Sequence, residues 1–160
     1  MMSTLPVRLM QVAAALSGLG ILLASYLTWV HFNTGSLVCG LGDCRTVQAS
    51  EYATIGPIPV AVLGLGMYVI VCLANVAGLA QPDRAMPLAM VAFGVLLAGT
   101  LYAVYLTWLE VAVIRAICQW CVVSAILSAV LLTLQGTVVW DLMLRPFPDA
   151  DETSSGPLAS

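Results

Sequence analysis

The chain contains no lysine, and only 8% of its 160 residues are charged. A water-soluble domain carries roughly 25% charged residues, so this composition excludes a fold that meets water on all sides. Without lysine the chain also has no basic surface of the kind that binds DNA or RNA. Nucleic acid is therefore excluded as a partner.

Histidine occurs once, as His31. A b-type haem with two axial histidines needs a second one, so one copy of the chain does not provide that site. Ionisable residues touch the apolar stretches only at their ends, at Arg8 and Glu110. The sequence thus lacks the ionisable residues that mark the ion paths of transporters.

Hydrophobic residues make up 61% of the chain. A helix needs about 20 mostly apolar residues to cross a bilayer, and four stretches are that long: 8–32, 58–80, 87–110 and 117–139. The sequence predicts an all-α membrane protein with a four-helix bundle in residues 1–148. The first stretch is expected to be a retained anchor rather than a signal peptide, and the acidic tail 149–160 to be disordered.

Four crossings place both termini on one side of the membrane and the long polar loop 33–57 on the other. We expect this loop to form a cap with a short helix over the bundle, beside the turn at Arg115. More arginines flank the face of the termini than the face of the loop, which favours cytoplasmic termini and an extracytoplasmic loop: Arg8, Arg84 and Arg145 against Arg45 and Arg115.

Four of the five cysteines fall on the face of the loop, as Cys39 with Cys44 and Cys118 with Cys121. Cys72 lies within an apolar run and is predicted to be a small buried hydrophobic residue. The second pair forms a Cys-x-x-Cys motif in the first turn of the last predicted helix. The helix dipole lowers the pKa of a thiol there, and the spacing permits a disulfide that opens and closes reversibly.

The loop pair lies among glycines that permit a tight turn. A flexible loop would swing one of its thiols to the Cys-x-x-Cys motif and pass on two electrons through a mixed disulfide. Two other interpretations stay open from the residues alone. In the first, the two pairs are static disulfides that staple the loop. In the second, the four cysteines together form a zinc site.

In its order of motifs the chain resembles the vitamin K epoxide reductase family in its bacterial form. The resemblance covers residues from about 10 to 140 and rests on Cys39, Cys44, Ser50, the run 56–65, Tyr68 and the motif 118–121. Another type of quinone-linked, disulfide-forming membrane enzyme has its Cys-x-x-Cys in the first loop. The reversed order here argues against that type.

The resemblance implies a quinone, of the ubiquinone or the menaquinone (vitamin K) type, held within the bundle. It implies that Cys121 lies beside the quinone, that Cys118 exchanges with the loop, and that Cys44 is the loop shuttle. Cys39 would then meet the partner or resolve the shuttle. The implied partner is a separate thioredoxin-like oxidoreductase, and the implied location is the bacterial inner membrane with the active site on the extracytoplasmic side.

Ser50 matches the family serine that hydrogen-bonds a quinone carbonyl, although a helix-capping or loop serine is an equal alternative. Trp120 and Tyr105 are candidate walls of the quinone pocket, together with Tyr102 and Trp108. Interfacial tryptophan and tyrosine are also common in any membrane protein. The charged residues on this face are expected to be solvated: Asp43, Arg45, Glu51, Glu110 and Arg115.

The predicted function is therefore a quinone-dependent thiol oxidoreductase that generates disulfides in a partner protein. The alternative is a small non-enzymatic membrane protein, or a transporter, with structural disulfides.

Overall fold

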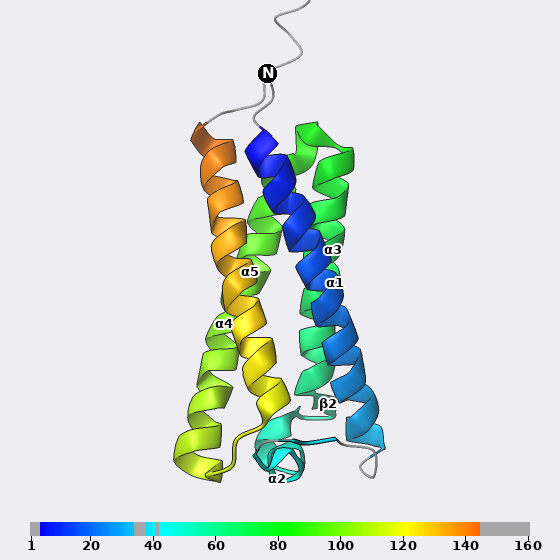
Figure 1. Ribbon diagram of the computed structural model, residues 1–160, viewed down its shortest axis with the longest axis vertical. Coiled ribbons are helices and arrows are strands. Elements are labelled where there is room, and N and C mark those ends of the chain that lie inside the picture. The colour runs from blue at the N-terminus through cyan, green and yellow to red at the C-terminus, as the bar shows by residue number, and fades with distance from the viewer. Residues whose placement is uncertain (1–3, 34–37, 41, 145–160) are drawn as a thin grey trace, which may run out of the picture.

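The computed structural model describes residues 4–33, 38–40 and 42–144. Its long helices are α1 (Thr4–Phe32), α3 (Val60–Ala80), α4 (Ala85–Leu109) and α5 (Gln119–Leu144). Each belongs to a span that is long and apolar enough to cross a membrane. Figure 1 shows them side by side, with α1 beginning and α5 ending at the same end of the bundle. The predicted four-helix membrane fold is confirmed.

Two of these helices run further than the sequence indicated. α1 begins at Thr4 rather than at residue 8, and α5 continues to Leu144 rather than ending near 139. A single charged residue does not end a helix, because it is solvated once it reaches the membrane surface; Arg8 is exposed within α1. The expected acidic tail lies outside the described residues.

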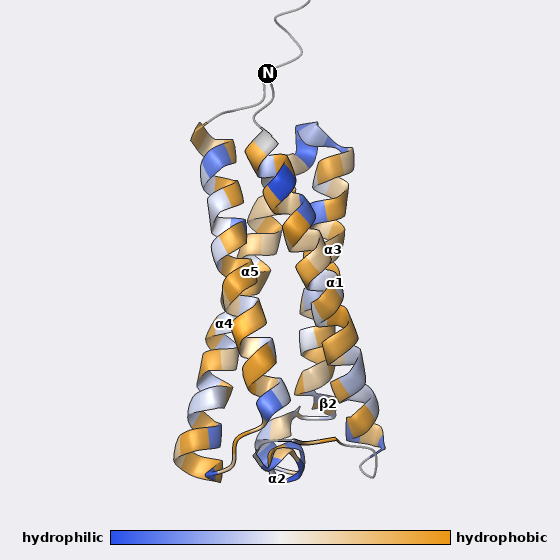
Figure 2. Ribbon diagram, in the orientation of Figure 1, coloured by the Kyte–Doolittle hydropathy of each residue, from blue (hydrophilic) through white to orange (hydrophobic). Residues whose placement is uncertain are grey.

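The outer surface of the bundle is apolar. Large hydrophobic side chains such as Leu22, Leu73 and Leu101 are exposed on different helices. In Figure 2 the middle of the bundle is mostly hydrophobic and the strongly hydrophilic segments gather toward its two ends. This distribution suits a lipid environment, since hydrocarbon gives no reason to bury such side chains.

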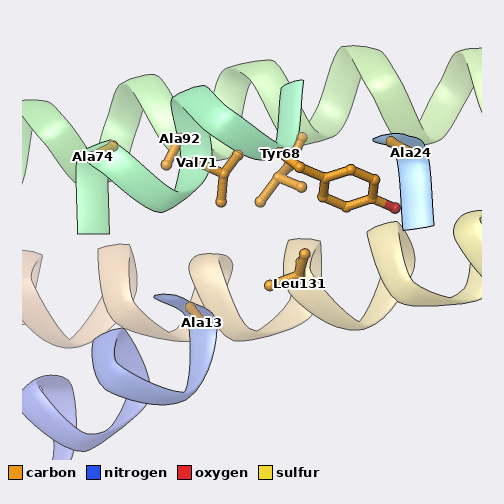
Figure 3. Packing of buried hydrophobic residues seen from close by; sticks show 8 residues of the cluster. Ala13, Ala24, Tyr68, Val71, Ala74, Ala92 and Leu131 are labelled. Carbon is orange, nitrogen blue, oxygen red and sulfur yellow. The ribbon is translucent and has the colours of Figure 1, made fainter. Parts of the chain in front are cut away.

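The interior of the bundle is built around Tyr68 of α3, which has 0% of its surface exposed. Figure 3 shows its ring between α3 and the helix that carries Leu131. The Tyr68 hydroxyl lies 3.0 Å from both the side-chain oxygen and the carbonyl oxygen of Ser124. Gly20 makes room for the ring, because a Cβ atom at this position would overlap it.

Replacing Gly20 with alanine is expected to lower the free energy of unfolding by about 1–3 kcal/mol, the usual cost of overpacking a core. The thermal midpoint in detergent should fall accordingly. Gly18→Ala is the matched control, since nothing lies within 4 Å of a Cβ at that position. Equal midpoints for the two variants would contradict the close contact with Tyr68.

Short elements cap the end of the bundle opposite the start of α1 (Figure 1). The segment between α1 and α3 forms α2 (Cys44–Gln48), the 3-10 helix η2 (Glu51–Ala53) and an antiparallel pair of strands, β1 (Thr54–Ile55) and β2 (Ile58–Pro59). A π-helix, η4 (Glu110–Ile114), follows α4, whereas the 3-10 turn η3 (Pro82–Arg84) links α3 to α4. The predicted cap of loop and short helix is therefore present.

Candidate functional site

The cysteines of both pairs meet at the capped end. Cys39 and Cys44 are joined by a disulfide, while Cys118 and Cys121 are free thiols. Cys44 and Cys118 both have 0% of their surface exposed and share one buried cluster with Val47. The loop cysteine thus already lies against the helix cysteine.

The loop is docked onto the segment that precedes α5. Gly42 forms an isolated antiparallel bridge with Cys118, and the Asp43 N–H donates to the Ile117 carbonyl at 3.0 Å. Gly42 has φ +85°, and a Cβ there would overlap the Ile117 carbonyl oxygen. We expected a loop that swings toward the helix pair; here backbone pairing already holds it there.

Asp43 fixes the start of α2, whose first residue is Cys44. Its carboxylate accepts the Thr46 N–H at 3.1 Å and the Thr46 hydroxyl at 2.6 Å. The hydroxyl and then the backbone of Thr46 lower the Asp43 pKa below its ordinary value of 3.8. Asp43 therefore remains a charged helix cap in moderately acidic solution.

Cys118 is the residue immediately before α5 rather than part of its first turn. Its carbonyl accepts the Val122 N–H at 3.0 Å, and its sulfur accepts the Cys121 N–H at 3.4 Å. The pKa of Cys118 is lowered, chiefly by the hydrogen bond from the Cys121 side chain, with burial opposing the shift. The sequence predicted a lowered thiol pKa here from the helix dipole, whereas the largest contribution at Cys118 comes from the Cys121 side chain.

The lowered pKa predicts that a thiolate forms at Cys118 below the ordinary thiol pKa of 9.0. A group with a depressed pKa is already ionised at pH values where a free thiol stays protonated. Ultraviolet absorbance of the thiolate measures this in a Cys72→Ala protein with the loop disulfide intact. Adding Cys121→Ala removes the main stabilising contact, so the first titration should move to higher pH. A titration that stays in place would contradict this cause.

A cavity of about 190 Å³ lies beside the helix pair. Its wall includes Cys121 but not Cys118, so the two thiols face different neighbours. All four long helices and the cap contribute, and most of the lining is apolar. Its polar side chains come mainly from the cap and from α5: Gln48, Ser50, Tyr52, Tyr102, Thr107, Glu110, Cys121, Ser124 and Ser128.

The residues predicted to hold a quinone divide into two groups. Ser50 and Cys121 line this cavity. The Ser50 hydroxyl donates to the Val47 carbonyl at 2.7 Å, and it makes no capping bond to η2. Tyr105 lies on the outside of α4, 49% exposed, beside Trp108, so it is not part of the cavity wall.

Trp120 is also absent from the cavity wall and instead holds the loop. Its indole N–H donates to the Val38 carbonyl at 2.9 Å, and its ring meets Tyr26 edge to face at 5.6 Å between centroids. Since Val38 immediately precedes Cys39, Trp120 fixes the start of the disulfide segment. Tyr102, the other aromatic candidate of α4, does line the cavity.

Glu110 lies at the site, although sequence reasoning placed it among the solvated charges. The expectation of a solvated charge is wrong, because only 3% of its surface is exposed. One carboxylate oxygen accepts the Cys118 N–H at 3.0 Å, and the carboxyl also interacts with the Cys121 thiol. The only signal in the sequence was one acidic residue at the end of an apolar stretch.

The arrangement of the sulfurs bears on the two alternatives from the sequence. Cys39 and Cys44 are bonded to each other, which leaves no set of four thiolates for zinc. Within the described part of the chain, no group of three or more metal-ligating side chains is placed to hold an ion. Because Cys118 and Cys121 are free, static stapling explains only the loop pair.

A comparison with models of known families agrees with this geometry. Residues 11–135 match the model of the "Vitamin K epoxide reductase family". The match covers most of the chain and includes both cysteine pairs, Ser50 and Glu110.

Proposed function

Because the chain belongs to the vitamin K epoxide reductase family, and is thus a membrane thiol oxidoreductase, we propose that it oxidises the dithiol of a thioredoxin-like protein at the expense of a quinone. The observation that carries this proposal is the position of the two helix cysteines. Cys118 packs against the loop disulfide, and Cys121 faces an apolar cavity within the bundle. One cysteine is thus placed for exchange with the loop, and the other for contact with a lipid-soluble acceptor.

The cavity suits part of a quinone. Pockets that enclose a drug-sized ligand measure roughly 300–1,000 Å³, so a space of about 190 Å³ would enclose a ring but not a long tail. Ser50 of the cap and Ser124 of α5 supply hydroxyls to the cavity wall. The quinone supplies a two-electron acceptor, and the Ser50 hydroxyl would turn from the Val47 carbonyl to donate to one of the quinone's carbonyl oxygens.

The shared buried cluster of Cys44 and Cys118 supports the following electron route. A reduced partner opens the Cys39–Cys44 disulfide and leaves two thiols in the loop. The Cys44 thiolate then attacks Cys118 of an oxidised helix pair, so a Cys44–Cys118 bond forms and the Cys118–Cys121 bond breaks. Attack of Cys39 on Cys44 restores the loop disulfide and releases Cys118.

The structure has the sulfur bonding that this exchange would produce. The loop pair is a disulfide and the helix pair is reduced. Closing the helix disulfide would pass two electrons and two protons to the quinone. Disulfide formation in the partner is thereby coupled to quinone reduction.

The proposal places the cap on the extracytoplasmic side of a bacterial inner membrane, where a thioredoxin-like partner reaches Cys39. A thiol reagent that does not cross membranes tests this orientation in intact cells. A cysteine introduced at Glu51 of the cap should be labelled, whereas one introduced at Asp83 of η3, at the other end, should not. The reverse pattern would overturn the orientation.

Purified protein in detergent, supplied with dithiothreitol and a short-chain ubiquinone or menadione, tests the activity. We expect loss of quinone absorbance at a rate well above that of the uncatalysed mixture, with one quinone consumed per disulfide formed. If neither quinone reacts faster than in the mixture without protein, the proposed function fails.

A further inference from the structure

We propose that Glu110 is the proton acceptor for the Cys121 thiol. This inference rests on the proposed function, because it names the group that prepares the cavity-facing sulfur to give up electrons. It assigns a further catalytic residue, since Glu110 touches a sulfur that reacts.

The first argument is placement. Glu110 lines the same cavity as Cys121, and its carboxyl interacts with that thiol. The opening turn of η4 directs the carboxyl toward the start of α5, where a hydrogen bond from the Cys118 N–H at 3.0 Å fixes its position. π-Helical turns inserted next to α-helices often occur at functional sites.

The second argument is the absence of a structural counter-ion. Glu110 is the one buried carboxylate among the described residues, and its interactions there are with Cys118 and Cys121 rather than with a basic side chain. Burying an unpaired charge is costly. A structural hydrogen bond to the Cys118 N–H needs only a neutral acceptor, such as an amide oxygen, so the ionisable group calls for another explanation.

The third argument is the proton inventory. The Cys121 thiol carries one proton, and two acceptors compete for it, the Cys118 sulfur and the Glu110 carboxylate. Cys118 becomes part of the disulfide when the pair is oxidised, so its sulfur cannot keep that proton. Glu110 is then the remaining acceptor in contact with Cys121.

The step balances as follows. The S–H bond of Cys121 breaks and an O–H bond forms on Glu110, with no change in oxidation state. The Cys118 and Cys121 sulfurs then bond to each other, and their two electrons pass to the quinone. Two protons accompany these electrons. Glu110 gives one of them. Water gives the other, which replaces the proton that the Cys118 thiol released when it ionised.

Alkylation of Cys121 tests the transfer without any quinone. Alkylating reagents attack the thiolate, and a Cys118→Ser background removes the competing sulfur. With Glu110 present, the thiol and the carboxylate share one proton, so part of the thiolate population does not depend on pH. The rate of alkylation by N-ethylmaleimide, followed by mass spectrometry of the Cys121 peptide, should level off in mildly acidic solution.

The variants separate this role from a structural one. Glu110→Gln keeps an oxygen for the Cys118 N–H but accepts no proton, so the rate should keep falling about tenfold per pH unit. Glu110→Asp keeps a carboxyl and should level off again. Asp83→Asn, at the other end of the bundle, is the control for a lost carboxylate. The basic side chains of the cap, Arg45 on α2 and Arg115 after η4, are exposed, which leaves Cys121 as the titrating neighbour of Glu110 in this background.

Two results would overturn the inference: a profile without levelling when Glu110 is intact, or a Glu110→Gln profile equal to that of its parent. The first needs no variant of Glu110 and so does not depend on how Glu110→Gln folds. With Cys118 restored, Glu110→Gln should also reduce quinone at least roughly 100-fold more slowly, as for loss of a general base. If the Cys118→Ser protein levels off but the protein with all its cysteines reduces no quinone, the proposed function fails while the proton transfer stands.

Discussion

Replacing Cys121 with alanine should abolish quinone reduction, with a loss on the order of 10³-fold or more, as for removal of one member of a catalytic unit. Among the described residues, Cys121 is the one cysteine on the cavity wall, so no neighbouring thiol takes its place. Quinone absorbance during turnover with dithiothreitol measures the loss. Cys118→Ala should have an effect of similar size, because the helix disulfide then cannot close.

Cys72→Ala is the matched control for these cysteine variants. Cys72 is a free cysteine of α3 whose sulfur lies 3.8 Å from the Ala14 carbonyl, away from both pairs. Its replacement should leave the rate unchanged. If Cys121→Ala kept the parent's rate while only thermal stability fell, the cysteines would be structural, and the non-enzymatic alternative would stand.

Gly42→Ala should slow the transfer between the loop and the helix pair by roughly 5- to 30-fold. A non-glycine residue in the left-handed region costs about 1–2 kcal/mol, which corresponds to a factor of that size in the docked population. Overlap of the new Cβ with the Ile117 carbonyl adds to this cost. The measurement is the rate at which a disulfide forms between Cys44 and Cys118 after diamide, a two-electron thiol oxidant, is added to a protein that lacks Cys39 and Cys121.

Gly40→Ala, in the same loop, is the control for this variant. A Cβ at Gly40 would come no closer than 3.5 Å to the Gln119 side chain, an ordinary contact. Cys121 alkylation in the reduced protein should be the same in both variants, since neither change touches the cavity. Equal rates of mixed-disulfide formation would show that docking through Gly42 does not govern the exchange.

The long helices and the shared location of the cysteines could be predicted from the sequence, because both follow from hydropathy and from counting crossings. The apolar runs needed no tertiary information. Two predicted crossings separate the loop that carries Cys44 from the turn before Cys118. Because that number is even, both segments had to fall at the same end of the bundle. Helix ends were less certain, since Arg8 does not interrupt α1.

The details of the site depend on contacts between distant residues, which local patterns do not contain. Gly42 pairs with Cys118, and Trp120 bonds to the carbonyl of Val38. The aromatic pattern gave Trp120 and Tyr105 equal weight, whereas only the packed structure shows that one holds the loop and the other faces outward. The orientation of the Glu110 side chain depends on the π-helical turn that begins at this residue. Counting residues along a regular α-helix instead places Glu110 at the membrane surface.

The cavity lies beside the cap, at the end of the bundle that carries both cysteine pairs, and this has an energetic consequence for the cell. Under the proposed function, electrons enter from the extracytoplasmic water, and protons are exchanged with that same water. No charge then crosses the dielectric of the bilayer during turnover, so the membrane voltage neither drives nor resists the reaction. Its rate should be the same in energised and in uncoupled vesicles at equal quinone content.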